Sequence, residues 1–299
     1  MEIGNIKITL SDHTNEITYS DGSIESELLE IVKSDINLET FVRSDNRWPI
    51  LYHLSPARHN LLRSFDFSNN DSVLEVGAGC GAFTGVLCDK FKNVTAVELS
   101  RLRAEVLAHR NKNRTNLEVI IGNLNDLSFD KEFDAITLIG VLEYAGKFTQ
   151  SPNPYNDFLV KMRGMLKPGG QLIIAIENRY GLKYWAGFKE DHLGKYFAGL
   201  EGYDINADVC TFSKKELESL LSDAGFKNLS FYYPLPDYKF ASTIVSENYN
   251  RFQDEMDVSF VNYDMSRVKI FDETKVFQNI VRENKLDFFA NSFLVFAGK

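Results

Sequence analysis

The middle of the chain alternates short apolar runs with helix-type segments, and this alternation constrains the fold more than any other feature. The apolar runs are rich in Val, Ile and Leu, and they occupy residues 72–76, 93–99, 117–122, 133–141 and 171–177. Runs of this composition are typical of strands that are buried on both faces of a sheet. Strands that alternate with helices predict a parallel α/β sheet covered by helices on both sides.

Two later segments complete the predicted sheet. The alternation stops after Glu177 for about 35 residues, which is too long for an ordinary connection. It resumes at "SKKE", where Ser213 and Glu216 form the pattern of a capping box. The runs at 228–234 and 287–298 then read as the last two strands, with a helix at 275–282 between them. We therefore expect a Rossmann-like, mostly parallel sheet of seven strands, with an insert after the fifth.

The N-terminal part has a different character. Runs at 6–10 and 16–19 flank a polar turn and predict a hairpin, and a helix is expected at 24–32. Ser55 followed by Pro56 is a typical helix start. We expect residues 1–54 to form a hairpin and helical extension that closes over the site. Residues 55–299 should form the main domain, with acceptor-site inserts at 178–212 and 234–289.

Composition excludes some classes of protein. The formal net charge of −9 argues against a long nucleic-acid groove, so no nucleic-acid partner is expected. Cys80, Cys88 and Cys210 form no CxxC pair, which indicates reduced thiols in a cytoplasmic protein. The N-terminus lacks the pattern of a signal peptide, and no apolar run reaches the ~20 residues that span a bilayer. Membrane insertion is therefore not expected.

A glycine-rich loop, "EVGAGCG", follows the first apolar run. A P-loop is excluded because no Gly-Lys-Ser/Thr follows the glycines. Gly77, Gly79 and Ala82 fit a relaxed dinucleotide pattern, and Glu98 lies about twenty residues further on, where a ribose ligand is expected. Glu75, however, puts a carboxylate just before the first glycine, where it would repel a pyrophosphate.

With the "LKPGG" turn before the fifth run, these residues resemble class I S-adenosylmethionine-dependent methyltransferases. The resemblance covers residues 55–233 and the last strand. It implies S-adenosylmethionine as cofactor and S-adenosylhomocysteine as product. Glu98 would accept hydrogen bonds from both ribose hydroxyls, and Asn123 would pair with adenine, although the family often has Asp there. The implied cofactor-binding set is Tyr52, His53, Arg58, Glu75, Gly77, Ala78, Gly79, Gly81, Glu98, Leu99, Asn123, Leu124 and Gly140.

Some of these assignments have alternatives. Asp126 is the alternative to Asn123 at the adenine. Arg58 would hold the methionine carboxylate, or it is an ordinary surface arginine. Tyr52 and His53 belong to the kind of N-terminal segment that often closes over the cofactor in this superfamily, but core packing explains an aromatic equally well.

A closer resemblance rests on "YHLSPARHNLLR", "VLEVGAGCGAFTG", "VTAVELSRLRAE", "TLIGVLEYA", "AIENRYGLKYWAGFKEDH" and "YYPLPDYKF". These segments are similar to a bacterial methyltransferase group associated with glycosyltransferases and cell-envelope polysaccharide synthesis. The resemblance implies a sugar or sugar-nucleotide acceptor and a glycosyltransferase partner. It gives no oligomeric state.

The insert after the fifth run leaves the carboxyl end of a strand, where open α/β sheets bind ligands. Its mixture of polar and aromatic residues suits a polar acceptor with apolar faces. We expect acceptor contacts from Glu177, Asn178, Tyr180, Asp237 and Tyr238. The insert's lysines, Lys183, Lys189 and Lys195, are expected to be solvated.

Methyl transfer from a sulfonium is an in-line displacement, so alignment is the enzyme's main work. A sugar hydroxyl would gain from a general base, and His192 is the first candidate because a neutral imidazole can take the proton. Glu143 is the second candidate, or it binds the cofactor's ammonium. No metal-ligand pattern is visible in the sequence.

The predicted function is O-methylation of a sugar or related polar small molecule. The alternatives are N-methylation of an amine-bearing metabolite and a non-catalytic, cofactor-binding partner of a glycosyltransferase. A nicotinamide-dependent oxidoreductase would need a second nucleotide half, and none is visible.

Overall fold

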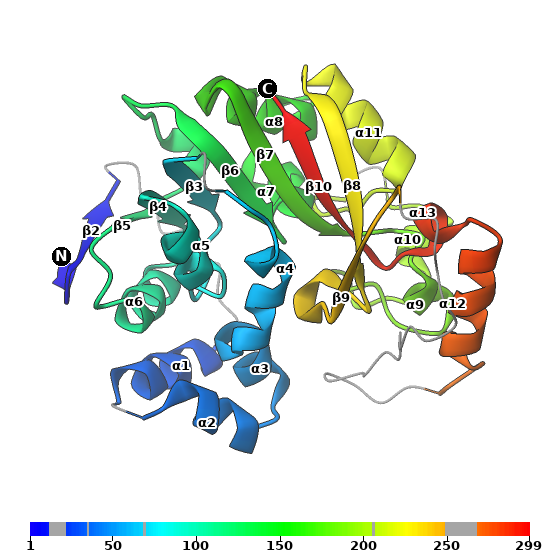
Figure 1. The fold of residues 1–299 in the computed structure, drawn as a ribbon, viewed down its shortest axis with the longest axis horizontal. Coiled ribbons are helices and arrows are strands. Elements are labelled where there is room, and N and C mark those ends of the chain that lie inside the picture. The colour runs from blue at the N-terminus through cyan, green and yellow to red at the C-terminus, as the bar shows by residue number, and fades with distance from the viewer. Residues whose placement is uncertain (12–21, 35, 68–69, 205–206, 249–267) are drawn as a thin grey trace. The chain divides into compact units, whose positions relative to one another are not determined.

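The computed structural model describes residues 1–11, 22–34, 36–67, 70–204, 207–248 and 268–299 (Figure 1). The chain divides into two compact units. Unit 1 comprises Met1–Leu138 and Met165–Gln171, and unit 2 comprises Ile139–Gly164 and Leu172–Lys299. Strand β7 (Leu166–Glu177) contributes residues to both units. Each unit is described by itself.

Unit 1 is built on the first strands of the predicted alternation. Its strands, in hydrogen-bonded order, are β1 (Glu2–Ile3), β2 (Ile6–Leu10), β5 (Leu117–Ile121), β4 (Asn93–Glu98), β3 (Ser72–Val76) and β6 (Phe133–Ile139). β1 and β2 are antiparallel, whereas every pairing from β2 to β6 is parallel. The buried face of these strands is almost entirely Val, Ile, Leu and Ala, as a sheet covered by helices requires.

Two helices and a 3-10 turn follow these strands. α5 (Thr84–Lys90) follows the glycine loop, and α6 (Arg101–Arg110) follows β4. The Ser100 hydroxyl accepts a hydrogen bond from the Arg103 amide at 3.4 Å, which caps α6. The 3-10 turn η2 (Leu124–Asp126) follows β5.

The N-terminal extension of unit 1 is helical. It contains α1 (Ile24–Lys33), α2 (Leu38–Ser44), α3 (Trp48–Leu54), the 3-10 turn η1 (Pro56–His59) and α4 (Asn60–Arg63). The apolar faces of α1 to α3 form one cluster with Cys80 of the glycine loop and Val106 of α6 (Figure 1). Arg103 and Glu25 add a buried ion pair at 2.6 Å between α6 and α1. The extension is therefore packed directly on the glycine loop.

Unit 2 contains the remaining strands and the inserts. β7, β10 (Ser292–Gly298), β8 (Lys227–Leu235) and β9 (Thr243–Ser246) are neighbours in that order, and β10–β8 and β8–β9 are antiparallel. Its helical elements are η3 (Leu142–Tyr144), α7 (Ala145–Phe148), α8 (Pro154–Met165), α9 (Leu182–Trp185), α10 (Ala198–Glu201), α11 (Lys214–Asp223), η4 (Tyr238–Phe240), α12 (Glu273–Arg282) and α13 (Leu286–Phe289). The capping box of α11 is confirmed, because Ser213 and Glu216 exchange both bonds, at 3.3 and 2.7 Å.

The expected strand count was wrong. The described residues form ten strands, in the order β1-β2-β5-β4-β3-β6-β7-β10-β8-β9, and not seven. β2 does not stand apart in a separate hairpin. Its alternate residues Ile6 and Ile8 are buried, and it extends the parallel ladder beside β5. Of the predicted hairpin, 6–10 is a strand whose observed hairpin partner is β1, while 16–19 lies outside the described residues.

Two element boundaries also differ from expectation. β7 begins at Leu166, so "LKPGG" is part of the strand and not a separate turn. Residues 287–289, expected as the start of the last strand, belong instead to α13. A residue distant in sequence accounts for this: the Asn178 side chain donates hydrogen bonds to the carbonyls of Phe288 and Ala290, each at 2.7 Å, and these carbonyls are then not used in a ladder. Among the described residues, no helix combines the length and apolar character that crossing a bilayer requires.

Candidate functional site

The glycine loop lies between β3 and α5 in unit 1. Gly77, Gly79 and Gly81 have φ angles of 64°, 55° and 76°, which side-chain-bearing residues rarely adopt. A Cβ on Gly81 would lie 2.9 Å from Leu107 of α6, so this glycine is required by packing. A Cβ on Gly79 would meet no atom of the described residues within 4 Å. The loop therefore leaves open space beside Gly79.

Glu98 ends β4 and is held beside that space. Its side chain is buried, and its two oxygens accept hydrogen bonds from the Gly79 amide at 2.7 Å and from the Ser100 amide at 2.8 Å. Burial raises the pKa of this carboxyl, and the backbone hydrogen bonds oppose the shift. A carboxylate offers about four lone-pair sites, so the two amides leave acceptor capacity for a ligand.

Glu75 has a partner inside the protein. It is buried in β3, and its Oε2 accepts a hydrogen bond from the Thr84 hydroxyl at 2.6 Å. Burial raises its pKa to about 8. Glu75 therefore fastens the first residue of α5 to the strand, and its contact with a cofactor stays a prediction.

The N-terminal residues 52 and 53 are tied to the loop through arginines. Arg110 of α6 donates to the backbone carbonyls of His53, at 2.6 Å, and of Cys80, at 2.7 Å. Burial lowers the pKa of Arg110 to about 10, which leaves the guanidinium charged at neutral pH. This one side chain joins α3 to the glycine loop, and it was not singled out from the sequence.

Arg58 is buried, contrary to the alternative of a surface arginine. It is 3% exposed, its Nη1 donates to the Tyr52 carbonyl at 2.9 Å, and its guanidinium lies 4.1 Å from the centre of the Tyr52 ring. The Phe83 ring lies 5.0 Å away on the loop. Within the described part of the chain, Arg58 Nε has no hydrogen-bond partner. A buried guanidinium with a donor unused is suited to an anionic ligand.

The predicted adenine contacts follow β5. Asn123 is half-buried, and its Oδ1 accepts from the Asn125 amide at 3.0 Å, which fixes the orientation of its amide group. Asp126 is exposed, whereas Leu124 is buried and Leu99 half-buried. These positions are compatible with the predicted roles, which remain predictions.

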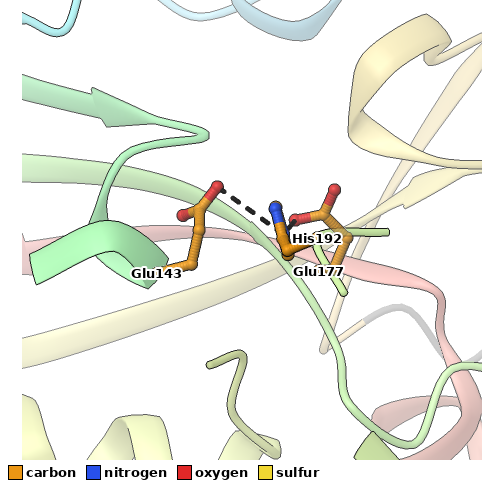
Figure 2. A group of neighbouring side chains, drawn as sticks. All are labelled: Glu143, Glu177 and His192. Carbon is orange, nitrogen blue, oxygen red and sulfur yellow. Dashed lines mark ion pairs between the residues drawn. The ribbon is translucent and has the colours of Figure 1, made fainter. Parts of the chain in front are cut away.

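In unit 2, three candidate residues from separate parts of the sequence converge (Figure 2). Glu143 lies in η3, Glu177 ends β7, and His192 lies in the insert. His192 Nε2 is 3.5 Å from Glu177 Oε2 and 4.0 Å from Glu143 Oε1. Both carboxylates are buried, and the imidazole is 8% exposed. The insert therefore brings His192 to the carboxyl end of β7, as expected.

The charges of this cluster depend on one another. The two glutamates raise the pKa of His192 to about 9 against the opposing effect of burial. Burial raises the pKa of Glu143, whereas Lys239 and His192 hold that of Glu177 below its usual range in spite of burial. The Tyr144 hydroxyl lies 3.0 Å from the other ring nitrogen, Nδ1. At neutral pH the imidazole is thus protonated, which disfavours it as a general base.

A chain of buried charges extends from Glu177. Lys239 Nζ contacts Glu177 Oε1 and, at 2.5 Å, Asp191 Oδ1. Lys183 Nζ lies 2.9 Å from Asp191 and 2.8 Å from Asp237. The prediction that Lys183 is solvated was wrong, because these two carboxylates hold it in the interior. Lys239 and Tyr184, which donates to Asp191 at 2.6 Å, were not predicted.

The other predicted acceptor residues lie around this network with different roles. Both amide protons of Asn178 are donated to backbone carbonyls, so a substrate contact through this group is not favoured. Tyr180 stacks on Phe288 at 5.0 Å between ring centres. Tyr238 is buried, and its hydroxyl would lie 2.9 Å from a Cβ on Gly140, whose φ is 68°.

Comparison with known proteins gives the class. Residues 74–174 match a family model described as a methyltransferase domain. An uncharacterized methyltransferase of Staphylococcus carnosus is 32% identical over 149 residues, which is 50% of this chain and 65% of that protein. A malonyl-[acyl-carrier protein] O-methyltransferase of Priestia megaterium is 29% identical over 118 residues, 39% of this chain and 40% of that protein.

A solved structure supports the same fold. Phosphoethanolamine N-methyltransferase 1 of Haemonchus contortus, in complex with phosphoethanolamine and S-adenosylhomocysteine, has a TM-score of 0.50 at 14% identity, covering 92% of this chain and 48% of that one. With the matched domain, this defines an α/β methyltransferase fold. Residues 74–174 therefore carry a methyltransferase domain, and S-adenosylmethionine is its cofactor. The chain spans 40% to 65% of the two curated relatives' lengths.

Proposed function

We propose that this protein transfers the methyl group of S-adenosylmethionine to a small-molecule acceptor. One observation carries the proposal: Glu98 is a buried carboxylate at the end of β4, fixed by two backbone amides beside the open space at Gly79. Hydroxyl groups of a ribose are suitable donors for the remaining lone pairs of that carboxylate. The matched methyltransferase domain includes this loop and this glutamate.

We assign the rest of the cofactor to unit 1 as follows. The methionine carboxylate pairs with Arg58, whose unused Nε supports an anionic partner. Adenine contacts Asn123 and Leu124. Residues 1–54 close over the cofactor through Tyr52 and His53, and the Arg110 bonds to His53 and Cys80 support this by tying the extension to the loop.

We assign the acceptor to the cluster of Glu143, Glu177 and His192. At neutral pH the raised pKa values leave His192 and Glu143 as hydrogen-bond donors, while Glu177 remains an ionised acceptor. A hydroxyl group can accept from the first two and donate to the third. The cluster then acts mainly by orienting the acceptor oxygen, and Glu177 is the ionised group available for its proton. A sugar hydroxyl, with a glycosyltransferase as partner, remains the acceptor that the sequence resemblance suggests.

Methylation of an amine is the second candidate, and one observation favours it. Glu177, the ionised carboxylate of the cluster, can accept a hydrogen bond from the N–H of an amine as it can from a hydroxyl group. The name of the Priestia protein indicates an oxygen acceptor, and the name of the Haemonchus protein indicates a nitrogen acceptor.

Two assays test the proposal. Calorimetry should give a saturable isotherm with S-adenosylhomocysteine and none with NAD, which separates a methyltransferase from an oxidoreductase. Turnover of S-adenosylmethionine should then be followed with matched hydroxyl and amine acceptors, such as a sugar nucleotide and its amino-sugar counterpart. Tight cofactor binding without S-adenosylhomocysteine formation from any acceptor would favour the non-catalytic alternative.

A further inference from the structure

The cluster of Glu143, Glu177 and His192 leaves three buried polar atoms unsatisfied. Glu143 Oε2, Glu177 Oε2 and His192 Nε2 have no hydrogen-bond partner among the described residues. The side chains are 1%, 0% and 8% exposed, so bulk solvent does not reach these atoms. Buried polar groups without a partner lower the stability of the fold unless a ligand or ion binds them. The three side chains converge, since each offers one possible metal-ligand atom within 4.8 Å of the others, and the Glu143 oxygen 4.0 Å from His192 Nε2 is Oε1 (Figure 2).

The spacing suits a single cation at the centre. Ligands about 2.1 Å from a metal ion lie about 3 Å apart when adjacent and about 4 Å apart when opposite. The imidazole nitrogen is 3.5 Å from one carboxylate and 4.0 Å from the other, which lies within this range. By contrast, direct hydrogen bonds between these atoms would require shorter separations.

The surroundings of the imidazole also match a metal ligand. Metal-binding histidines almost always donate their other ring N–H to a fixed acceptor, which selects the tautomer. Here the Tyr144 hydroxyl lies 3.0 Å from His192 Nδ1 and can accept that proton, so a metal ion has to displace only the proton on Nε2, the nitrogen that faces the carboxylates. Lys239 contacts the other oxygen of Glu177 and fixes that carboxylate in the same way.

We propose that Glu143, Glu177 and His192 bind a divalent transition-metal ion. Two carboxylates and one imidazole form a mixed oxygen and nitrogen set, which suits Mn²⁺, Fe²⁺ or Zn²⁺ better than Mg²⁺ or Ca²⁺. An ammonium group is a poorer occupant of the cluster. It can bind these side chains only by donating hydrogen bonds, and the imidazole nitrogen contributes less to such binding than to coordination of a metal ion. Glu177 keeps its contact with Lys239 when its second oxygen coordinates.

Three protein ligands leave open positions on the ion for an acceptor oxygen, which would then coordinate the ion in place of the hydrogen bonds assigned above to Glu143, Glu177 and His192. A bound metal would polarise that oxygen and ease loss of its proton. This catalytic role rests on the proposed function, whereas metal binding itself does not. No metal-ligand pattern is visible in the sequence, because the three ligands lie far apart along the chain.

The test is a titration of chelator-treated protein with Mn²⁺, followed by the loss of the free-ion signal in electron paramagnetic resonance. The wild type should show one saturable site, and Mn²⁺ should raise its melting temperature. His192→Ala and Glu177→Gln should weaken binding by about 100-fold or more, and Tyr144→Phe by about 10- to 100-fold. Glu273→Gln is the matched control, a buried glutamate at the start of α12, and should bind Mn²⁺ as the wild type does.

Each outcome decides the proposal. A wild type without a saturable Mn²⁺ site overturns it, as does unchanged affinity in both ligand variants. If one ligand variant fails to fold, Glu143→Gln, which preserves side-chain shape, replaces it. S-adenosylhomocysteine affinity is measured on the same samples. If the protein binds S-adenosylhomocysteine but not Mn²⁺, the metal site alone is rejected. If it binds Mn²⁺ but not S-adenosylhomocysteine, the proposed function alone is rejected.

Discussion

Replacing Glu98 by Gln removes one charge and one acceptor oxygen from the proposed ribose site while preserving shape. In the wild type each carboxylate oxygen accepts one backbone amide, at 2.7 Å from Gly79 and 2.8 Å from Ser100. The glutamine NH₂ must face one of these N–H groups, so a donor opposes a donor at that position. The ribose simultaneously loses a charged acceptor, and a hydrogen bond to a charged group contributes about 1.5–3 kcal/mol.

The expected result is a 10- to 150-fold rise in the S-adenosylhomocysteine Kd, at roughly tenfold per 1.4 kcal/mol. Calorimetry at constant salt measures it, with circular dichroism to check folding. Glu118→Gln is the control, since Glu118 lies on the neighbouring strand β5, its side chain is 41% exposed, and it should bind as the wild type does. A folded Glu98→Gln protein with wild-type affinity would refute the placement of the ribose.

Three further predictions follow from unit 1. Gly79→Val should abolish S-adenosylhomocysteine binding while leaving the chain folded, because its side chain enters the open space; loss of the circular dichroism signal would instead make the loop primarily structural. Arg58→Met should weaken binding of S-adenosylhomocysteine but not of 5′-methylthioadenosine, which lacks the carboxylate; equal losses for the two ligands would exclude the assigned pairing. Glu75 has a folded-state pKa of about 8, above its ordinary 4.5, so the folded state binds its proton more tightly. The free energy of unfolding should therefore fall as pH rises between these values, by a few kcal/mol in order of magnitude, and stay level above pH 8. Glu75→Gln should remove this fall, which urea unfolding of the wild type and the variant at pH 6 and pH 9 would measure. An equal decrease in the free energy of unfolding in both proteins would show that Glu75 is not its cause.

The strands of the α/β alternation could be predicted because each is a short apolar run closed by a turn or cap. β3 and β4 begin at the predicted residues, and the capping residue Ser213 lies where expected. The additional strands were missed because pairing depends on a partner. β2 becomes part of the main sheet only through the edge of β5, and β9 only through β8.

The segment at 286–289 shows how a distant residue overrides local pattern. Its aromatic residues indicate a strand in isolation, and the buried amide of Asn178 fixes them in a helical turn. Lys183 shows the same limit for charge. A lysine in a polar insert is normally solvated. Here Asp191 of the insert and Asp237, which lies well beyond the insert, hold Lys183 in the interior.

The candidate sites were predictable to different degrees. Glu98 and the glycines occupy fixed positions around one strand-loop-helix unit, so their spacing, together with the family resemblance, singled them out as candidates. Glu143, Glu177 and His192 were each singled out by position near a strand end or in the insert, but their convergence could not be read from the sequence. Lys239, Tyr144 and Arg110 were missed because their contacts are all with residues distant in sequence or with backbone carbonyls.

The central claim is that this protein transfers a methyl group from S-adenosylmethionine to a small molecule. Its most direct test is incubation with S-adenosylmethionine carrying a deuterated methyl group and a small-molecule cell extract, followed by mass spectrometry. The account predicts S-adenosylhomocysteine together with a deuteromethyl-labelled small molecule, both strongly reduced in Glu98→Gln. Bound cofactor that stays intact, with no labelled small molecule in the extract, would contradict it.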